Sequence, residues 1–338
     1  MADVVAGVVA DLWLGHRRGP AVVEDGVVVP ADVAAPVGSD TVIPGIVDRH
    51  VHLGLVDPSA FAGGLVVEVH DLGWVPSQAV EWRSDPPAGV TVRIAGPFHT
   101  APGGYPSGRA WAPEESVRAV RDADDARAAV AEAVSIRPRS SLARATRPTT
   151  GVDFLKIALQ DRMALLDDET LGALVAAAHD AGLPAVVHAE GAGQAARAID
   201  AGADVLAHTP WTEVLDEDAL ARGLDVTWIS TLAIQTGRGR RNALENIWRF
   251  RGLGGRVVYG TDLGNGPALP GVNEEEILAL GEAGLAGDDL LTAVTGVGGG
   301  DALPLGRALA APLPLPGTAA QLVAWLRAAR RLDPTGGQ

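Results

Sequence analysis

Two histidines in the stretch DRHVHL are spaced so that they could bind a metal ion together. His50 and His52 are two residues apart, and on a β-strand this spacing puts both imidazoles on the same face. The chain has no cysteine, so any metal must be held by nitrogen and oxygen ligands. The pair therefore predicts one part of a metal site.

Lys156, in the stretch GVDFLKIAL, is the only lysine in a chain that contains twenty-six arginines. A surface position needs only a positive charge on a long stem, which arginine supplies as well. A buried lysine differs because it can lose its proton and react, whereas arginine stays protonated. The retained lysine therefore indicates a position where the amine itself is needed, unless it is a chance survivor.

The elements that must position these residues alternate short β-branched runs with helical stretches, a pattern typical of parallel strands joined by crossover helices. We expect helices within 114–134, 167–182 and 191–204. Eight strands in this rhythm predict an α/β fold, the (β/α)8 TIM barrel. The expected strands are 41–52, 64–72, 90–98, 153–159, 184–190, 205–209, 225–231 and 256–262.

Further polar residues stand at the ends of the later strands, where a barrel of this kind gathers its functional groups. His188, His208 and Asp262 lie at the ends of strands 5, 6 and 8. Taken singly, each histidine could be structural, and Asp262 in GTDLGNG could form a turn or cap a helix. Together with His50, His52 and Lys156 they predict a metal site at one mouth of the barrel.

The two ends of the chain lack the alternation of strands and helices that is expected in the middle. Residues 1–44 and 303–338 contain short strand-like runs, among them PLPLPGTAAQLVAW, and predict a small β-sandwich-like domain built from both termini. Residues 45–302 would form the barrel. An arginine-rich insertion at 137–151 is expected to be a solvated loop on the face away from the metal site.

Composition limits the partners. Hydrophobic residues make up 47% and charged residues 20% of 338, as in a globular protein with a sizeable core. The formal charge of −15 argues against nucleic acid and against an anionic membrane surface. The apolar N-terminus has no basic residue ahead of it and contains Asp3 and Asp11, so neither a signal peptide nor a membrane span is expected. A cytoplasmic protein is the default expectation, and a homo-oligomer is a general prior.

At this point the sequence resembles the amidohydrolase superfamily. PGIVDRHVHLG is similar to its signature on strand 1, GVDFLKI to the strand that carries a carboxylated lysine, GPFHTAPGGYP to a third-strand loop of its peptidase-like members, and PGTAAQLVAW to its closing β-segment. The resemblance covers nearly the whole chain and extends to the peptidase-like and imidazolonepropionase-like members. It is specific for the superfamily and weakly specific for substrate.

The resemblance implies the ligand sets. His50, His52 and Asp262 would bind the more buried metal, and His188 and His208 the second. Lys156 would take up carbon dioxide and bridge both metals as a carbamate. Zinc suits mixed imidazole and oxygen ligation, although manganese, cobalt, nickel and iron remain open.

The implied activity is hydrolysis of an amide-type C–N bond in a small molecule, such as an N-acyl amino acid, a dipeptide or a cyclic amide. A hydroxide bridging two metals would attack, and Asp262 would pass its proton to the leaving nitrogen. The nearest alternative is a deaminase with a single metal on His50, His52, His188 and Asp262. A lactonase or phosphotriesterase, or a non-catalytic scaffold, also remains open.

Four residues are candidates for substrate binding. Tyr105 and His99 lie just past strand 3, where they could line the pocket, and Tyr105 could contact the substrate carbonyl. Peptidase-like relatives have His-Ala-His after strand 5, whereas this chain has Glu190 at the last position, where it could contact substrate, act as an acid or support a ligand. Arg238, in GRGRR after strand 7, could clamp a substrate carboxylate or simply begin a helix.

Overall fold

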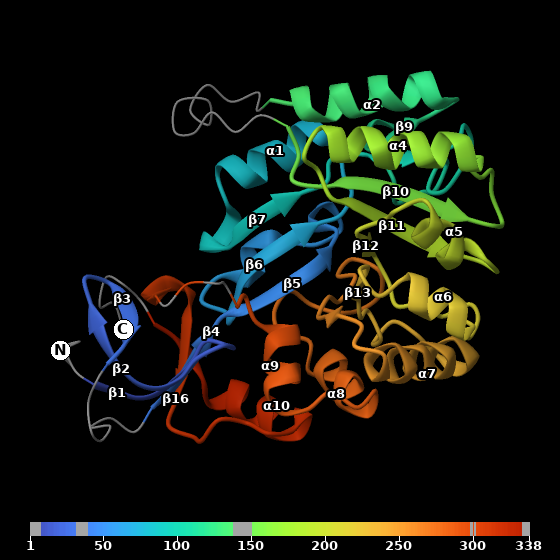
Figure 1. Cartoon of the computed structure of the whole chain (residues 1–338). Helices are drawn as coiled ribbons and strands as arrows, with labels where there is room; N and C mark the ends of the chain where they lie inside the picture. The colour runs from blue at the N-terminus through green and yellow to red at the C-terminus, as the bar shows by residue number, and fades with distance from the viewer. Residues whose placement is uncertain (1–7, 32–39, 138–150, 298–299, 301, 333–338) are drawn as a thin grey trace.

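The computed structural model describes residues 8–31, 40–137, 151–297, 300 and 302–332. The middle of the chain is α/β, with parallel strands and helices packed outside them, and a further sheet lies to one side (Figure 1). The arginine-rich insertion predicted at 137–151 falls almost entirely outside the described residues. So do the ends of the chain, 1–7 and 333–338.

The parallel strands form two sheets. Three strands pair in the order β5-β6-β7, and seven pair in the order β14-β13-β12-β11-β10-β8-β9. Their bounds are β5 Ile46–Val51, β6 Val66–Asp71, β7 Thr91–Ile94, β8 Phe98–Thr100, β9 Val117–Ala119, β10 Leu155–Gln160, β11 Ala185–Glu190, β12 Val205–Leu206, β13 Thr227–Ile229 and β14 Val257–Val258.

The two parallel sheets meet through backbone hydrogen bonds. On one side Asp153 N donates to Ile94 O at 2.7 Å, and on the other His52 N donates to Leu263 O at 2.8 Å. An isolated parallel bridge joins Val51 to Leu263. Strand pairing is not continuous around the set in the described residues, so the α/β class with parallel strands is confirmed and the closed barrel stays a prediction.

Helices cover the outside of the parallel strands, with α2 and α4 side by side at the top of Figure 1 and α7 at the lower right. Strand side chains from Leu155, Ile157 and Leu159 pack outward against them in the main core. The helices expected within 167–182 and 191–204 are found as α4 and α5. The one expected within 114–134 is found only in its second half, as α2, because 114–119 form a short 3-10 turn and strand β9. The helix bounds are α1 Pro76–Ser84, α2 Ala123–Ser135, α4 Asp168–Asp180, α5 Gln194–Asp200, α6 Glu217–Arg222, α7 Gly237–Gly252, α8 Glu274–Glu282, α9 Gly287–Val294 and α10 Ala319–Ala328.

The further sheet draws strands from both ends of the chain, in the order β15-β3-β2-β1-β4-β16-β17, and lies at the lower left of Figure 1. Both ends of the chain therefore contribute strands to one sheet. A separate sandwich-like domain with the boundaries 1–44 and 303–338 stays a prediction. The strand bounds are β1 Val8–Trp13, β2 Arg18–Glu24, β3 Val27–Pro30, β4 Thr41–Pro44, β15 Leu303–Pro304, β16 Ala308–Ala311 and β17 Arg330–Arg331.

The expected strand at 41–52 is two strands. β4 belongs to the terminal sheet and β5 to the parallel strands, with Gly45 between them. A side chain at Gly45 would come within 2.3 Å of Val67 Cγ1, so glycine is needed for the close approach. The expected strand at 90–98 divides in the same way into β7 and β8.

The strand expected within PGTAAQLVAW is wrong, because residues 319–328 form helix α10. Thr318 caps the helix by accepting a hydrogen bond from Gln321 N. Leu322, Val323 and Leu326 are buried, and their three- and four-residue spacing is that of a helix face rather than a strand.

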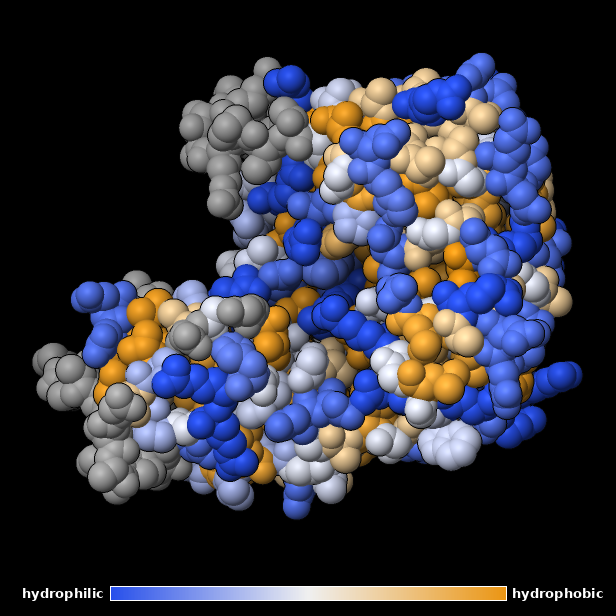
Figure 2. Space-filling model, in the orientation of Figure 1, coloured by the Kyte–Doolittle hydropathy of each residue, from blue (hydrophilic) through white to orange (hydrophobic). Residues whose placement is uncertain are grey.

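In the described residues, no helix has the length and apolarity needed to cross a membrane. On the face shown in Figure 2, hydrophobic residues are interspersed with hydrophilic ones. The cytoplasmic location stays a prediction.

Candidate metal centre

All six predicted ligand residues line one cavity of about 1010 Å³. Five of them reach it from the second half of a parallel strand or from the segment that follows, and Lys156 reaches it from the start of β10. His50 lies on β5 and His52 directly after it, β10 and β11 contribute one residue each, and the segments after β12 and β14 contribute one each. The fold thus brings together the side chains of His50, His52, Lys156, His188, His208 and Asp262.

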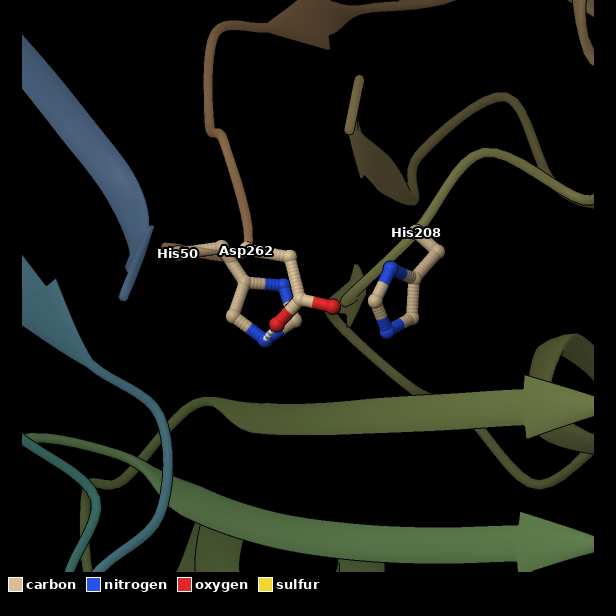
Figure 3. A group of neighbouring side chains, drawn as sticks. All are labelled: His50, His208 and Asp262. Atoms are coloured by element: carbon tan, nitrogen blue, oxygen red, sulfur yellow. Dashed lines mark ion pairs between the residues drawn. The ribbon is translucent and has the colours of Figure 1, made fainter. Parts of the chain in front are cut away.

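The tightest contacts in this group surround Asp262. Its Oδ1 lies 3.2 Å from Nε2 of His50 and 3.2 Å from Nε2 of His52. Ligand atoms of His50, His208 and Asp262 all lie within 4.8 Å of one another, and Figure 3 shows the carboxylate between the two imidazoles. His208, predicted for the second metal, thus lies beside two ligands predicted for the more buried metal. The division of the ligands between two metals therefore remains a prediction.

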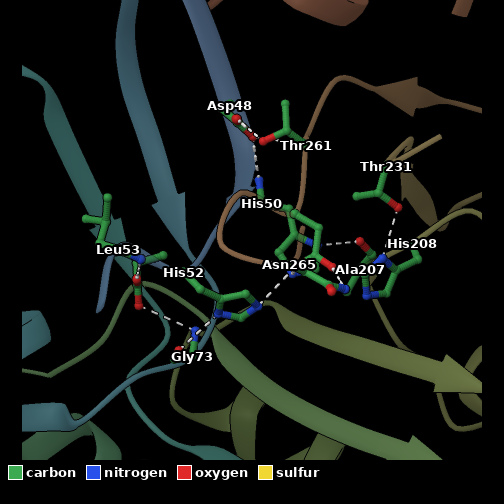
Figure 4. Close-up of polar contacts among 12 residues, drawn as sticks. Asp48, His50, His52, Leu53, Gly73, Ala207, His208, Thr231, Thr261 and Asn265 are labelled. Atoms are coloured by element: carbon green, nitrogen blue, oxygen red, sulfur yellow. Dashed lines mark hydrogen bonds and ion pairs between the residues drawn. The ribbon is translucent and has the colours of Figure 1, made fainter. Parts of the chain in front are cut away.

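Backbone carbonyls fix the tautomers of His50 and His52. His50 Nδ1 lies 2.7 Å from Ala207 O, and His52 Nδ1 lies 3.1 Å from Gly73 O (Figure 4). Because a carbonyl oxygen only accepts, each Nδ1 carries the proton and donates it. Each Nε2 therefore presents a lone pair toward Asp262, the arrangement expected of metal-ligating histidines.

These atoms fit a cation. Burial lowers the pKa of His50 well below its usual value, so its imidazole is neutral. Burial alone would raise the pKa of Asp262, but positive charge on its neighbours, His50 first, lowers it well below its usual value, so Asp262 is the ionised partner of this pair. His50 Nε2 is buried without a hydrogen-bond partner among the described residues. A buried carboxylate facing imidazole lone pairs needs a positive charge between them, which a metal ion would supply.

Lys156 is buried with 1% of its surface exposed. Burial lowers the pKa of its amine to about 7, and the carboxylates of Asp262 and Asp71 oppose the shift. A large fraction of the amine is therefore neutral near pH 7. A neutral amine is the form that can take up carbon dioxide, so the chemistry of this position suits the predicted carbamate.

The outer part of the site is built around His188. Tyr105 stacks on its ring with centroids 5.0 Å apart and an interplanar angle of 22°. Glu190 Oε2 lies 3.5 Å from His188 Nε2 and accepts a hydrogen bond from Gln160 Nε2 at 2.7 Å. The pairing of β10 with β11 sets Gln160 opposite Glu190. Tyr105 and Glu190 both line the cavity.

The other two substrate candidates are not brought to the cavity. His99 is fully buried, its Nδ1 lies 3.0 Å from Lys156 O, and its neighbour Phe98 lines the cavity instead. Successive side chains of a strand point to opposite faces, so His99 on β8 points outward. Arg238 is exposed in the first turn of α7 and is absent from the lining. Neither position supports a substrate contact in this structure.

Several supporting residues escaped the sequence reasoning. Asp48 Oδ1 accepts from His50 N at 3.1 Å and from Thr261 N at 3.0 Å, which ties the strand carrying His50 to the segment carrying Asp262. Asp48 lies two residues before His50 on the same strand, and this spacing in the sequence could have indicated its supporting role. Burial raises the pKa of Asp48 to about 7.

Thr231 also supports the site, because its Oγ1 lies 2.9 Å from His208 Nδ1. Thr231 and Asp262 have positive φ angles of 43° and 54°. Backbone strain of this kind in residues other than glycine concentrates at functional sites, where the surrounding structure holds it in place. No pattern in the sequence signals it.

Two tryptophans line the cavity and were also missed. Trp211 lies with its ring centroid 5.2 Å from that of His208, and Trp111 lies 6.2 Å from His52. Trp211 comes directly after the strand end that carries His208, so its place in HTPW was a usable signal. These rings give the cavity an apolar wall.

No protein-family model and no curated protein matches this chain. Solved structures do match over nearly the full length of both chains. A Xaa-Pro dipeptidase with bound methionine is 17% identical with a TM-score of 0.67, covering 95% of this chain and 96% of that one. The A. niger ochratoxinase is 15% identical with a TM-score of 0.70, covering 97% and 94%.

A molinate hydrolase is also similar, at 15% identity and a TM-score of 0.67, covering 97% and 94%. Another neighbour is named as an amidohydrolase. The chain therefore has the fold of the amidohydrolase superfamily. The resemblance seen in the sequence is confirmed at the level of fold, and identities this low carry no further conclusion about substrate.

Proposed function

We propose that this protein is a metal-dependent hydrolase of amide-type C–N bonds in small molecules. One observation carries the proposal. Nε2 of His50 and Nε2 of His52 both face Oδ1 of Asp262 at 3.2 Å, at the base of a cavity that Lys156 also lines. The names of the structural neighbours, a Xaa-Pro dipeptidase and an amidohydrolase among them, support the choice of bond.

Six residues would hold two divalent cations, with Lys156 as a carbamate between them. The donor set contains imidazole nitrogen and carboxylate oxygen without thiolate, which suits zinc. Such cations, when bound, polarise a carbonyl and lower the pKa of water. The metal ligands would be His50, His52, Lys156, His188, His208 and Asp262.

The chain's own groups would then move the proton and orient the substrate. Asp262, ionised and buried, would take a proton from the attacking water and return it to the leaving nitrogen. Burial raises the pKa of Tyr105 above its usual value, so its phenol stays protonated. From its place against His188 in the cavity wall, that hydroxyl can donate to the substrate carbonyl.

The first test measures metal content and hydrolysis together. Protein loaded with zinc and bicarbonate is expected to hold about two metal ions per chain by elemental analysis and to hydrolyse members of a panel of N-acyl amines, N-acyl amino acids, dipeptides and cyclic amides. Asp262→Asn should lower turnover by about 10²- to 10⁴-fold. Wild-type protein that is fully loaded and cleaves no amide would overturn the proposal.

One observation favours a second candidate, the deaminase with a single metal. Glu190 lies in the cavity wall beside His188, where a carboxyl could protonate a ring nitrogen. This enzyme would hold about one metal ion per chain and would release ammonia from aminated heterocycles. Metal content and ammonia release therefore separate the two candidates.

A further inference from the structure

The described part of the cavity wall contains almost no positively charged side chain. Among the described residues that line it, Lys156 is the only lysine or arginine, and the proposed function commits that amine to the metals. Four carboxylates line the same cavity: Glu190, Asp262, Glu274 and Glu275. A substrate carboxylate bound here would find no guanidinium or ammonium partner in the wall.

Aromatic side chains form the wall next to the ligand histidines. Tyr105 stacks on His188, and Trp111 lies between Tyr105 and His52, with ring centroids 6.1 Å and 6.2 Å away. Trp211 also contacts His188, with ring centroids 5.9 Å apart. A wall of this kind suits a bulky apolar or aromatic group on the substrate.

Glu190 places a carboxylate in the cavity wall beside the ligand histidines, where it opposes a carboxylate on the substrate. Its Oε2 lies 3.5 Å from His188 Nε2, and 24% of the side chain is exposed toward the cavity. Gln160 fixes that oxygen from the neighbouring strand, so the negative charge cannot readily swing away. Like charges placed side by side in a recess suppress binding of the wrong ligand.

Some basic groups lie near the cavity without lining it, among them Arg162, whose charge acts on Glu190. Arg109 lies beyond Tyr105, with its Cζ 5.9 Å from the ring centre, and donates to Met163 Sδ. Arg240 pairs with Glu282 and donates to Leu232 O. The N-terminus of α8 also reaches the cavity. The Asn273 side chain caps this helix end by accepting a hydrogen bond from Glu276 N, and the first turn of the helix carries three glutamates.

We propose that the substrate is an amide without a free carboxylate, whose apolar or aromatic group packs between Tyr105, Trp111 and Trp211, and that Glu190 excludes carboxylate-bearing analogues. This inference rests on the proposed function and narrows it. Among the candidate substrates, simple N-acyl amines and cyclic amides are preferred over N-acyl amino acids and dipeptides.

The test uses three compounds that share one scissile acetamide. N-acetyl-2-phenylethylamine has no group at the α-carbon, N-acetylphenylalanine has a carboxylate there, and N-acetylphenylalaninamide has a neutral group of the same size. Release of the amine is followed by chromatography. The two neutral compounds are expected to have kcat/KM values at least about tenfold higher than that of the acid.

Glu190→Gln removes the charge and keeps the shape of the side chain. It should raise kcat/KM for the acid relative to the neutral amide, which narrows the ratio by at least about threefold. Glu245→Gln makes the same charge change on an exposed position of α7 that does not line the cavity, and should leave the ratio as it is. Trp211→Ala should lower kcat/KM for all three compounds by a similar factor.

The outcomes separate this inference from the proposed function. If the acid is cleaved as well as or better than its amide, the inference is wrong although the hydrolase proposal holds. Loss of that preference in Arg109→Ala would then identify Arg109 as the carboxylate partner. If none is cleaved, quenching of tryptophan fluorescence by each compound still decides the matter, since equal or tighter binding of the acid contradicts the inference.

Discussion

Thr261 Oγ1 donates a hydrogen bond to Asp48 Oδ2 at 2.6 Å, joining the first parallel strand to the segment after the last one. His50 lies two residues after Asp48, and Asp262 is the residue after Thr261. Neither partner of the bond is a proposed metal ligand, but the bond fixes the distance between the backbone segments that carry His50 and Asp262 (Figure 4).

We predict that Thr261→Val destabilises the metal-free protein by about 1–3 kcal/mol, because it leaves a buried carboxylate oxygen of Asp48 without its donor. Urea denaturation at pH 8 measures the change in the free energy of unfolding. Thr209→Val is the matched control, since Thr209 Oγ1 makes only a 3.5 Å contact with Ile229 O. Equal losses in both variants would contradict the assignment.

Lys156 offers a direct spectroscopic prediction because it is the only lysine of the chain. With ¹³C-bicarbonate and zinc, the protein should show one side-chain carbamate signal by NMR, since no other ε-amine is present. Lys156→Arg keeps the positive stem but cannot form a carbamate, so it should lose this signal and at least one metal ion per chain. Full metal content and turnover in that variant would refute the bridging role.

Thr231 is expected to act through His208. Thr231→Val removes the hydroxyl 2.9 Å from His208 Nδ1 but keeps a β-branched side chain at the same strained backbone position. We expect metal affinity to fall by about 10- to 100-fold, as for other groups that orient a ligating histidine. Thr231→Ser should restore most of it. Competition with a chelator measures the dissociation constants, and unchanged affinity in the valine variant would refute the role.

Glu276 is fully buried in α8, and its Oε2 accepts a hydrogen bond from Ala233 N at 2.6 Å. Burial raises its pKa from 4.5 to about 7. The folded state then holds a proton that the unfolded state releases, so this group's stabilising contribution is present below pH 4.5 and is lost as the pH rises through about 7.

In metal-free protein, the titration of Glu276 should lower the free energy of unfolding by roughly 3 kcal/mol between about pH 4.5 and pH 8. We predict that this part of the decrease is absent in Glu276→Gln. Comparing the two pH values within each variant cancels any constant cost of the amide. Glu275→Gln, on an exposed neighbour in the same helical turn, should leave the slope unaltered. An identical slope in wild type and Glu276→Gln would show that this carboxyl does not titrate in that range.

Much of the candidate site could be predicted because strand geometry is local. The i, i+2 spacing of His50 and His52 fixes their common face, and the β-rich runs mark where strands end. The same alternation places His99 on the face opposite to Phe98, which lines the cavity, so the structure lends a substrate contact by His99 no support. The helix at 319–328 was missed because an apolar run after prolines suits either element until packing selects one.

The sequence by itself determined which donors the chain can offer a metal: imidazoles, one carboxylate and a lone amine at the ends of strands, with no thiol among them. The tertiary structure decided how those donors are held and what surrounds them. Gly45 divides two sheets, Ala207 and Gly73 carbonyls fix two imidazole tautomers, and no arginine is among the described residues that line the cavity. These features depend on contacts between residues far apart in the chain, which no local pattern encodes.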